Sequence, residues 1–260
     1  MSEADLLFET RDGIGWITFN RSSSRNALTL DMYDRLEAIC ASLEAGGPVR
    51  CLVLTGAGDK AFAAGTDMSE FRAFARDEDA LAYEAQMDRV MGAVEACSVP
   101  TIAAIAGACT GGGAAIAAAC DMRLANANLR FGFPIARTLG NCLSIANLSR
   151  LVALIGAGRT KELIFTARLA GAEEARAIGL VSEILPDHSS LMARARDLAE
   201  TIAGHAPLTL ASTKEALRRL RLEGAGAEDR DLIVSAYMSA DFREGMEAFL
   251  AKRKPQWTGR

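Results

Sequence analysis

Two apolar runs that both end in glycine place the tightest limits on how this chain can fold. They are "CLVLTGAG" at 51–58 and "VPTIAAIAG" at 99–107, and neither contains a charged side chain. A strand made of such a run is buried on both faces, which is typical of parallel sheets covered by helices. Amphipathic stretches alternate with these runs, so we predict an α/β fold with parallel strands.

The spacing of apolar residues predicts the other elements of this α/β part. Alternation in "DGIGWITFNR" at 12–21 predicts a strand that follows a tight turn. Helical spacing predicts helices over 29–45 and 69–97. The segment 121–134 is predicted to form one or two short strands, and "KAFAAGTD" at 60–67 to form a loop.

The C-terminal part of the chain has a different pattern. From about residue 145 onward the sequence is predicted to be mostly helical, and "PLTLASTKEALRRL" and "SADFREGMEAFLAKRKPQW" are both amphipathic. We therefore divide the chain into an α/β core, 1–203, and a helical C-terminal region, 204–260.

Charge and hydropathy argue against several classes of partner. The net charge of the 260 residues is −4 with both signs interspersed, which does not favour nucleic-acid binding. No run of about 18 uncharged apolar residues occurs, so no membrane span is expected. The N-terminal "MSEADLLFETRDG" lacks the basic and apolar regions of a signal peptide, so we expect a cytoplasmic protein.

The cysteines and histidines do not indicate a metal site. The six cysteines show no CxxC spacing, and neither histidine lies near a carboxylate cluster, so neither zinc nor a Ser/His triad is expected. Cys142 is left open between a reactive thiol and a small buried side chain. The other five are predicted to be small buried side chains, namely Cys40, Cys51, Cys97, Cys109 and Cys120.

Two glycine-containing loops follow predicted strands, at 63–67 and 107–113. Ligands of α/β proteins gather at the carboxyl ends of strands. Glycine permits close backbone approach, and a helix N-terminus presents unpaired N–H groups. Two such loops can direct two amides at one oxygen, an oxyanion hole that stabilises an enolate. The same spacing also fits two tight strand–helix turns, and "GACTGGG" lacks the glycine spacing of a dinucleotide site.

The sequence as a whole resembles the crotonase superfamily, the enoyl-CoA hydratase/isomerase group. The resemblance covers nearly the whole chain in "NRSSSRNAL", "CLVLTGAGDKAFAAGTDMSEF", "VPTIAAIAGACTGGGAAIAAACDMRLANANLRFGFP", "RTKELIFTARLAGAEEARAIGLVSEILP", "APLTLASTKEAL" and "DFREGMEAFLAKRKPQW". It implies a spiral core of ββα turns, a helical C-terminal trimerisation region, and a homotrimer or dimer of trimers. It also implies a coenzyme A thioester as ligand, with coenzyme A arriving as part of the substrate and no separate cofactor.

The resemblance implies roles for individual residues. The two oxyanion amides fall on Thr66, where family members usually have alanine, and on Gly112. Arg25 and Lys252 match residues of the coenzyme A site, although an ordinary solvated charge is the alternative for both. The full implied set for binding coenzyme A is Arg25, Asn26, Ala27, Leu28, Ala64, Asp67, Phe249 and Lys252, the last two often across a subunit boundary.

The sequence departs from the family pattern at two positions. Hydratases of the family carry two glutamates, and their places are taken here by Ala115 and Ile135. Neither side chain can transfer a proton, so we expect an enolate-stabilising reaction other than two-glutamate hydration, namely isomerisation, decarboxylation, C–C cleavage or thioester hydrolysis. A non-catalytic acyl-CoA-binding protein and a hydratase with a relocated base are the alternatives. The acyl pocket is predicted to include Ala115, Phe133, Ile135 and Leu139.

Two segments contain candidates for a relocated base. No carboxylate occurs from 124 to 161, but Cys142 near a helix start can serve as nucleophile or base. Asn141 can cap that helix, or orient a water or a substrate carbonyl. The helical stretch 69–97 supplies Glu70, Tyr83, Glu84 and Asp88, for which a solvated helix face is the alternative. A substrate carboxylate or a bound anion can also take the place of the missing side chain.

Overall fold

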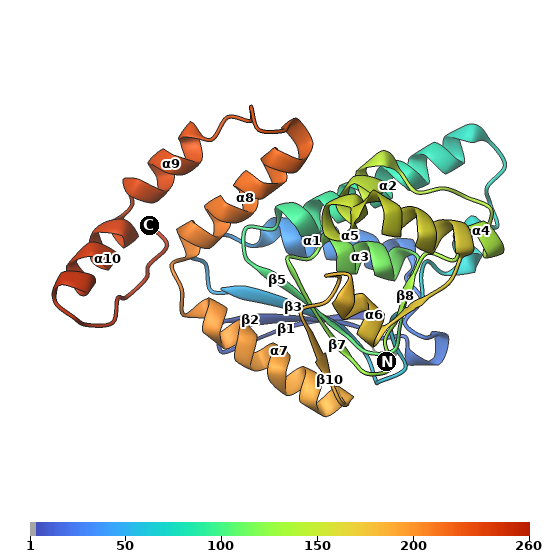
Figure 1. Ribbon diagram of the computed structural model, residues 1–260, viewed down its shortest axis with the longest axis horizontal. Coiled ribbons are helices and arrows are strands. Elements are labelled where there is room, and N and C mark those ends of the chain that lie inside the picture. The colour runs from blue at the N-terminus through green and yellow to red at the C-terminus, as the bar shows by residue number, and fades with distance from the viewer. Residues whose placement is uncertain (1–3) are drawn as a thin grey trace.

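Two β-sheets form the centre of the fold (Figure 1). The structure, a computed structural model, describes residues 4–260. The larger sheet has the strand order β1 (Leu6–Arg11), β2 (Ile14–Phe19), β3 (Cys51–Gly56), β5 (Thr101–Ile105), β7 (Met122–Asn126) and β10 (Glu183–Leu185). The smaller sheet has the order β4 (Ala61–Ala63), β6 (Ala108–Thr110), β8 (Arg130–Gly132) and β9 (Ala170–Gly171). Apart from β1–β2 and β8–β9, the named strands of the described chain pair in parallel, which confirms the predicted α/β class.

The strand β3 shows why its sequence is apolar throughout. Cys51 and Val53 face one hydrophobic cluster, which helix α7 (His188–Ala203) completes. Leu52 and Leu54 face the other cluster, on the opposite side of the sheet. Side chains alternate between the faces of a strand, so a strand between two cores must be apolar at every position.

The chain alternates between the two sheets in a repeated ββα turn. The pairs β3–β4, β5–β6 and β7–β8 each place one strand in each sheet, and each pair is followed by a helix. This is the spiral that the family resemblance implies. Gly107 forms the corner between β5 and β6 with φ +65°, and a Cβ there would lie 2.2 Å from the Lys60 carbonyl oxygen. The corner therefore requires glycine.

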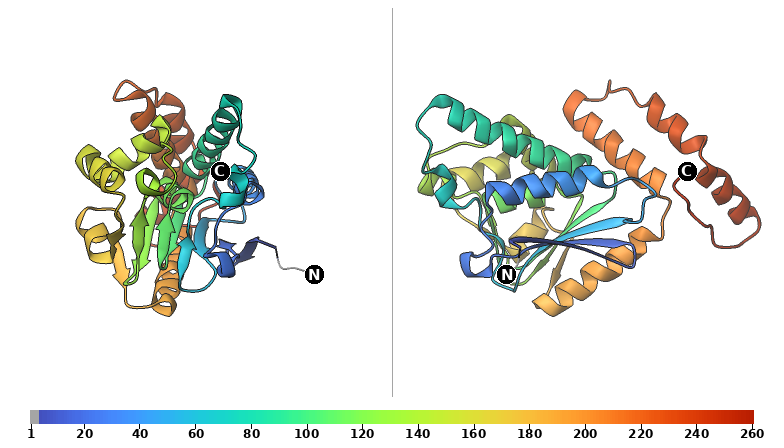
Figure 2. Two further views of the ribbon diagram at one scale, coloured as in Figure 1. Left: turned by 90° about the vertical axis from the view of Figure 1, so that its right-hand side faces the viewer. Right: turned by 180° about the vertical axis from the view of Figure 1, so that it is seen from behind.

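Helices cover both faces of the larger sheet (Figure 2). Helix α7 packs on one face, and α1, α2, α3 and α5 lie over the other. None of the helices within residues 4–260 is long and apolar enough to cross a bilayer. The helices are α1 Leu30–Ser42, α2 Asp77–Ala96, α3 Gly112–Ala119, α4 Ile135–Thr138, α5 Ile145–Thr166, α6 Ala172–Ala177, α7 His188–Ala203, α8 Pro207–Glu223, α9 Arg230–Tyr237 and α10 Ala240–Leu250, with 3₁₀ helices η1 Ser22–Ser24 and η2 Met68–Phe71.

The last three helices extend from one end of the molecule (Figure 1). The chain terminus folds back onto α10, where the buried Asp241 carboxylate accepts hydrogen bonds from the amides of Thr258 and Gly259 at 2.7 and 2.8 Å. Most of the exposed large apolar side chains of the described residues lie in α8–α10. The assignment of 204–260 to oligomerisation stays a prediction.

Two segments in the N-terminal half of the chain, 60–67 and 69–97, differ from the sequence-based prediction. The helix predicted over 69–97 is instead the short η2 followed by α2, because the Asp79 carboxylate accepts from the amides of Ala75 and Arg76 and starts a new helix at Asp77. The predicted loop 60–67 contains β4, whose three residues are too few to show a periodicity.

Candidate active site

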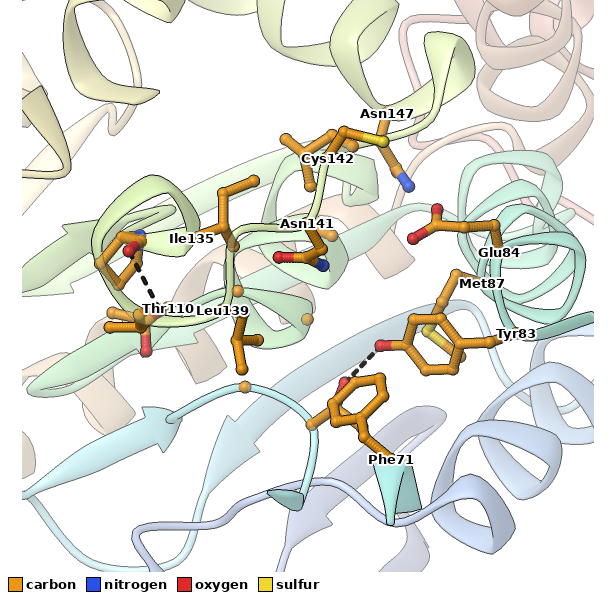
Figure 3. Close-up of a pocket in the computed structure, with 18 of the residues that line it drawn as sticks. Phe71, Tyr83, Glu84, Met87, Thr110, Ile135, Leu139, Asn141, Cys142 and Asn147 are labelled. Atoms are coloured by element: carbon orange, nitrogen blue, oxygen red, sulfur yellow. Dashed lines mark hydrogen bonds between the residues drawn. The ribbon is translucent and has the colours of Figure 1, made fainter. Parts of the chain in front are cut away.

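A cavity of about 380 Å³ opens between the carboxyl ends of β4 and β6 and helices α2, α4 and α5 (Figure 3). The two loops predicted from glycine spacing both border it. Glu84 is the single charged residue among those that line it in the described chain. The lining residues are Ala64, Gly65, Thr66, Met68, Phe71, Tyr83, Glu84, Met87, Met91, Thr110, Gly111, Gly112, Ala115, Pro134, Ile135, Thr138, Leu139, Asn141, Cys142, Leu143 and Asn147.

A short bridge to Leu28 sets the direction of the Thr66 amide. The Leu28 N–H donates to the Gly65 carbonyl, and the Leu28 carbonyl accepts from the Asp67 N–H, both at 2.8 Å. In a parallel bridge the residue between these two, Thr66, directs its own N–H and C=O away from the partner strand. No hydrogen bond from the Thr66 amide is present within residues 4–260. The amide therefore remains a free donor beside the cavity.

The second amide belongs to Gly112, the first residue of α3. The opening N–H groups of a helix have no intrahelical acceptor, so this amide is also a free donor. The two loops lie against each other, because the Thr110 hydroxyl donates to the Ala64 carbonyl at 2.9 Å. A Cβ placed on Gly65 would lie 3.9 Å from the Gly112 nitrogen. With φ +109° at Gly65 and +54° at Gly111, both loops adopt backbone conformations that favour glycine.

A chain of three hydroxyl groups supports the first loop. The Thr66 hydroxyl lies 2.9 Å from the Tyr33 hydroxyl and 2.7 Å from the Tyr83 hydroxyl. Burial raises the pKa of both tyrosines, so both phenols are neutral at physiological pH. Tyr83 also packs edge-on against Phe71, with ring centroids 5.0 Å apart. The threonine side chain thus ties the loop to α1 and α2, which an alanine would not do.

Glu84 and Tyr83 are the two sequence candidates from the helical stretch that reach the cavity. The other two are used elsewhere: the Ser144 hydroxyl donates to Asp88 at 2.5 Å, and Glu70 accepts from the Leu30 amide at 3.4 Å. No hydrogen bond or ion pair of the Glu84 carboxylate is present in the described chain. Burial, and then the negative charge of Asp88, raises the pKa of Glu84 above its ordinary value.

The wall of the cavity opposite Glu84 is largely apolar. Ala115 and Ile135 both line the cavity, as expected for the acyl pocket, and Leu139 joins them. Phe133 does not line it, in contrast to the prediction. Its ring packs perpendicular to that of Phe131 at 5.9 Å, inside the core. Phe133 lies two positions after the fully buried Phe131 of β8, so its side chain is directed to the same core.

The loop before α5 corrects two expectations. Asn141 does not cap the helix, because the Ser144 hydroxyl accepts from the Asn147 amide and is the N-cap. Cys142 is exposed at the rim of the cavity, so the alternative of a small buried cysteine is wrong for it. The prediction of burial is confirmed for the other five cysteines.

The residues implied for coenzyme A binding fall into three groups. Arg25 is exposed and Ala64 lines the cavity, and the Arg25 carbonyl accepts from the Ala64 amide at 3.1 Å. Asn26 and Leu28 are buried, so their side chains position loops instead of facing a ligand. Ala27 is half-buried, and Asp67 forms an ion pair with Arg21. Phe249 and Lys252 are exposed and lie at the far end of the molecule (Figure 1).

Sequence reasoning missed several residues of the cavity. Tyr33 of α1 supports the cavity-lining Thr66 from behind, and this hydroxyl contact has no signal in the sequence. Met87 and Met91 lie on the cavity side of α2, and their spacing from Glu84 by three and seven residues is the signal that could have found this face.

The ion pair between Asp67 and Arg21 predicts a pH dependence of stability. Hydrogen bonds from the Ser69 hydroxyl and amide, and then from Arg21, lower the pKa of Asp67 to about 2. A carboxyl group with a lowered pKa in the folded state stabilises the fold at any pH above its ordinary pKa. This stabilisation is lost as the pH falls through the pKa of the folded state. Asp67→Asn should therefore be less stable than wild type at neutral pH. The difference in unfolding free energy, measured by urea denaturation, should shrink between about pH 5 and about pH 2. A pH-independent difference would contradict this prediction.

Comparison with known proteins finds one family and many relatives. The model of the family described as enoyl-CoA hydratase/isomerase matches residues 9–260. The chain is 33% identical to a short-chain-enoyl-CoA hydratase of Clostridium acetobutylicum over 96% of each protein. The crystal structure of an enoyl-CoA hydratase/carnithine racemase from Magnetospirillum magneticum superposes with a TM-score of 0.88 at 32% identity, over 100% of this chain and 97% of that one. An enoyl-CoA hydratase from Bacillus anthracis gives a TM-score of 0.87 at 32% identity, over 99% and 100%.

Proposed function

Because the chain belongs to the enoyl-CoA hydratase/isomerase family, we propose that it binds an acyl-CoA thioester with the carbonyl oxygen on the amides of Thr66 and Gly112. The observation that carries this proposal is the pair of adjacent loops whose two amides are free donors beside one cavity. When a proton leaves the α-carbon, negative charge moves to the thioester oxygen. Two fixed amides stabilise that charge without reorganising.

The apolar cavity fits the acyl part of the substrate. Its wall includes Met87, Met91 and Leu139, and its volume of about 380 Å³ is in the range of small-molecule sites. We propose that the acyl chain lies along this apolar wall. The coenzyme A portion of the bound substrate then extends out of the cavity beside Ala64. Arg25, exposed on the adjoining loop, supplies a positive charge there.

The reaction proposed for this site differs from hydration by two glutamates. Ala115 and Ile135 occupy the cavity wall where the family pattern calls for carboxylates, and neither can hold or protonate a water. Enolate formation with proton transfer needs only the oxyanion amides and one base. Hydration by a relocated base is the second candidate, and the names of the relatives favour it.

The test follows the α-carbon directly. Purified protein is incubated in D₂O with a panel of saturated, 2-enoyl and 3-enoyl CoA thioesters, and mass spectrometry records deuterium uptake, water addition and double-bond position. We expect deuterium exchange at the α-carbon and little net hydration. Rapid water addition to a 2-enoyl thioester would favour the second candidate. Binding of thioesters without exchange or product would show a non-catalytic binding protein.

A further inference from the structure

We propose that Glu84, on α2, is the catalytic acid–base residue of this site and carries a proton between two carbons of the bound acyl chain. The proposal rests on the proposed function, because it needs a thioester whose enolate the Thr66 and Gly112 amides stabilise. It assigns the proton transfer to a helix that neither of the two family glutamate positions occupies.

The face of α2 that borders the cavity places Glu84 there. Met87 and Met91 follow at spacings of three and seven residues and line the same cavity, so the three side chains share one helix face. Asp88, one turn further, points instead to Ser144, the N-cap residue of α5. Figure 3 shows the Glu84 carboxylate directed into the cavity, toward Asn141 and Asn147. Glu84 is therefore not part of a solvated helix face.

The Glu84 carboxylate has no hydrogen-bond or ion-pair partner within the described residues, unlike the other acidic side chains around the cavity and on α2. Asp67 is held by Ser69 and Arg21, and Asp88 is held by Ser144. Glu95, further along α2, is paired with two arginines of α5 and α8. Within residues 4–260 no cation approaches Glu84, and partial burial favours its neutral form. A raised carboxyl pKa makes Glu84 a stronger base toward a carbon-bound proton than an ordinary glutamate.

Two asparagines frame the carboxylate. Arg150 donates to the Asn147 side-chain oxygen at 3.2 Å, and this bond orients the amide so that its nitrogen faces Glu84 (Figure 3). Asn141 faces Glu84 from the other side of the cavity. An amide can hydrogen-bond a carboxyl group in either protonation state, so the two asparagines can accompany Glu84 through a proton transfer without pairing it as a cation would.

One base in an apolar cavity is suited to moving a double bond. With a 3-enoyl thioester, Glu84 removes the proton from C2, and the electron pair forms a dienolate whose oxygen is held by the two amides. The protonated Glu84 then gives a proton to C4, so that the double bond moves from C3–C4 to C2–C3, and exchange of the carboxyl proton with D₂O before this step introduces deuterium. One carboxyl group accepts a proton and donates a proton in each turnover, so the reaction needs neither an added water molecule nor a second acid.

The experiment compares Glu84→Gln with Glu70→Gln, a matched change of carboxylate to amide on a residue outside the cavity. The readouts are α-deuterium exchange and conversion of 3-enoyl to 2-enoyl thioester, together with calorimetric binding of a saturated thioester. We expect E84Q to lose about 10²–10⁴-fold in both rates. Its thioester affinity should change by less than about threefold, and E70Q should match wild type.

Further variants separate a catalytic from a positioning role. Glu84→Asp keeps a shorter carboxylate and should retain more activity than E84Q, and the wild-type rate should fall at low pH as Glu84 becomes protonated. Asp88, Tyr83 and Cys142 are the other titratable groups near this part of the cavity. The decrease in rate at low pH must therefore be absent from the pH–rate profile of E84Q if Glu84 causes it. Exchange by E84Q at the wild-type rate would overturn the assignment of Glu84 alone. Absence of exchange in wild type would overturn the proposed function itself.

Discussion

Gly112→Ala is expected to lower kcat/KM for an acyl-CoA substrate by about 10²–10³-fold, the loss typical of removing one oxyanion donor. An added Cβ at Gly112 would lie 1.8 Å from the Tyr33 hydroxyl oxygen. Tyr33 is fully buried and cannot move aside, so the loop that carries the Gly112 amide must shift instead. The amide then no longer points to the position of the developing oxyanion.

The same geometry supplies the control for Gly112→Ala. Tyr33→Phe removes the clashing oxygen, and the nearest ring atom to the new Cβ is then Cζ at 3.1 Å, a contact that a far smaller shift of the loop relieves. The double variant should recover a substantial part of the activity relative to G112A alone. Steady-state kinetics on the two single variants and the double variant measure this coupling. Purely additive losses would mean that the steric contact does not cause the defect.

Asn26→Ala is expected to destabilise the protein by about 2–4 kcal/mol, the sum of three lost hydrogen bonds and of backbone strain. The fully buried Asn26 amide donates to the carbonyls of Ala57 and Ala61 at 3.1 and 2.7 Å, and its oxygen accepts from the Arg21 amide. Its φ of +55° is a left-handed conformation that asparagine tolerates better than alanine. Urea denaturation of wild type and variant at equal concentration measures the loss.

Asn26→Gly separates the two contributions. Glycine adopts a positive φ without strain but restores no hydrogen bond. The glycine variant should therefore lie between wild type and Asn26→Ala, about 1 kcal/mol more stable than the latter. Because Asn26 connects the loop at Arg25 to the strands β3 and β4, both variants should also raise KM for the thioester. Equal stability of wild type and Asn26→Ala would refute the structural role of this side chain.

The parallel α/β core was predictable because its signal is local. The run at 51–58 is apolar at every position, and the structure places Leu52 and Val53 in two different clusters on opposite faces of β3. The short strand β4 was not predictable, because three residues carry no periodicity and its pairing with β6 is a long-range contact. Helix α2 was placed too early, because the new helix start at Asp77 depends on the side chain of Asp79.

The candidate site divides in the same way. The loops that carry Thr66 and Gly112 could be found in the sequence, since glycine after a buried strand marks a close backbone approach. Cys142 and Glu84 could be named only as candidates among several. Whether the Glu84 side chain enters the cavity depends on which face of α2 borders it. Whether Cys142 is exposed depends on how the turn before α5 packs at the cavity rim.

The sequence by itself determined the alternation of buried strands and helices, the glycine loops and the absence of a carboxylate at Ala115 and Ile135, because each is a property of residue type and spacing along one segment. Only the tertiary structure decided that Glu84 shares a cavity with the Thr66 and Gly112 amides while Asp88 and Glu70 do not. A cavity is bounded by segments far apart in the chain. Their mutual placement follows from packing across the whole core, which no local pattern encodes.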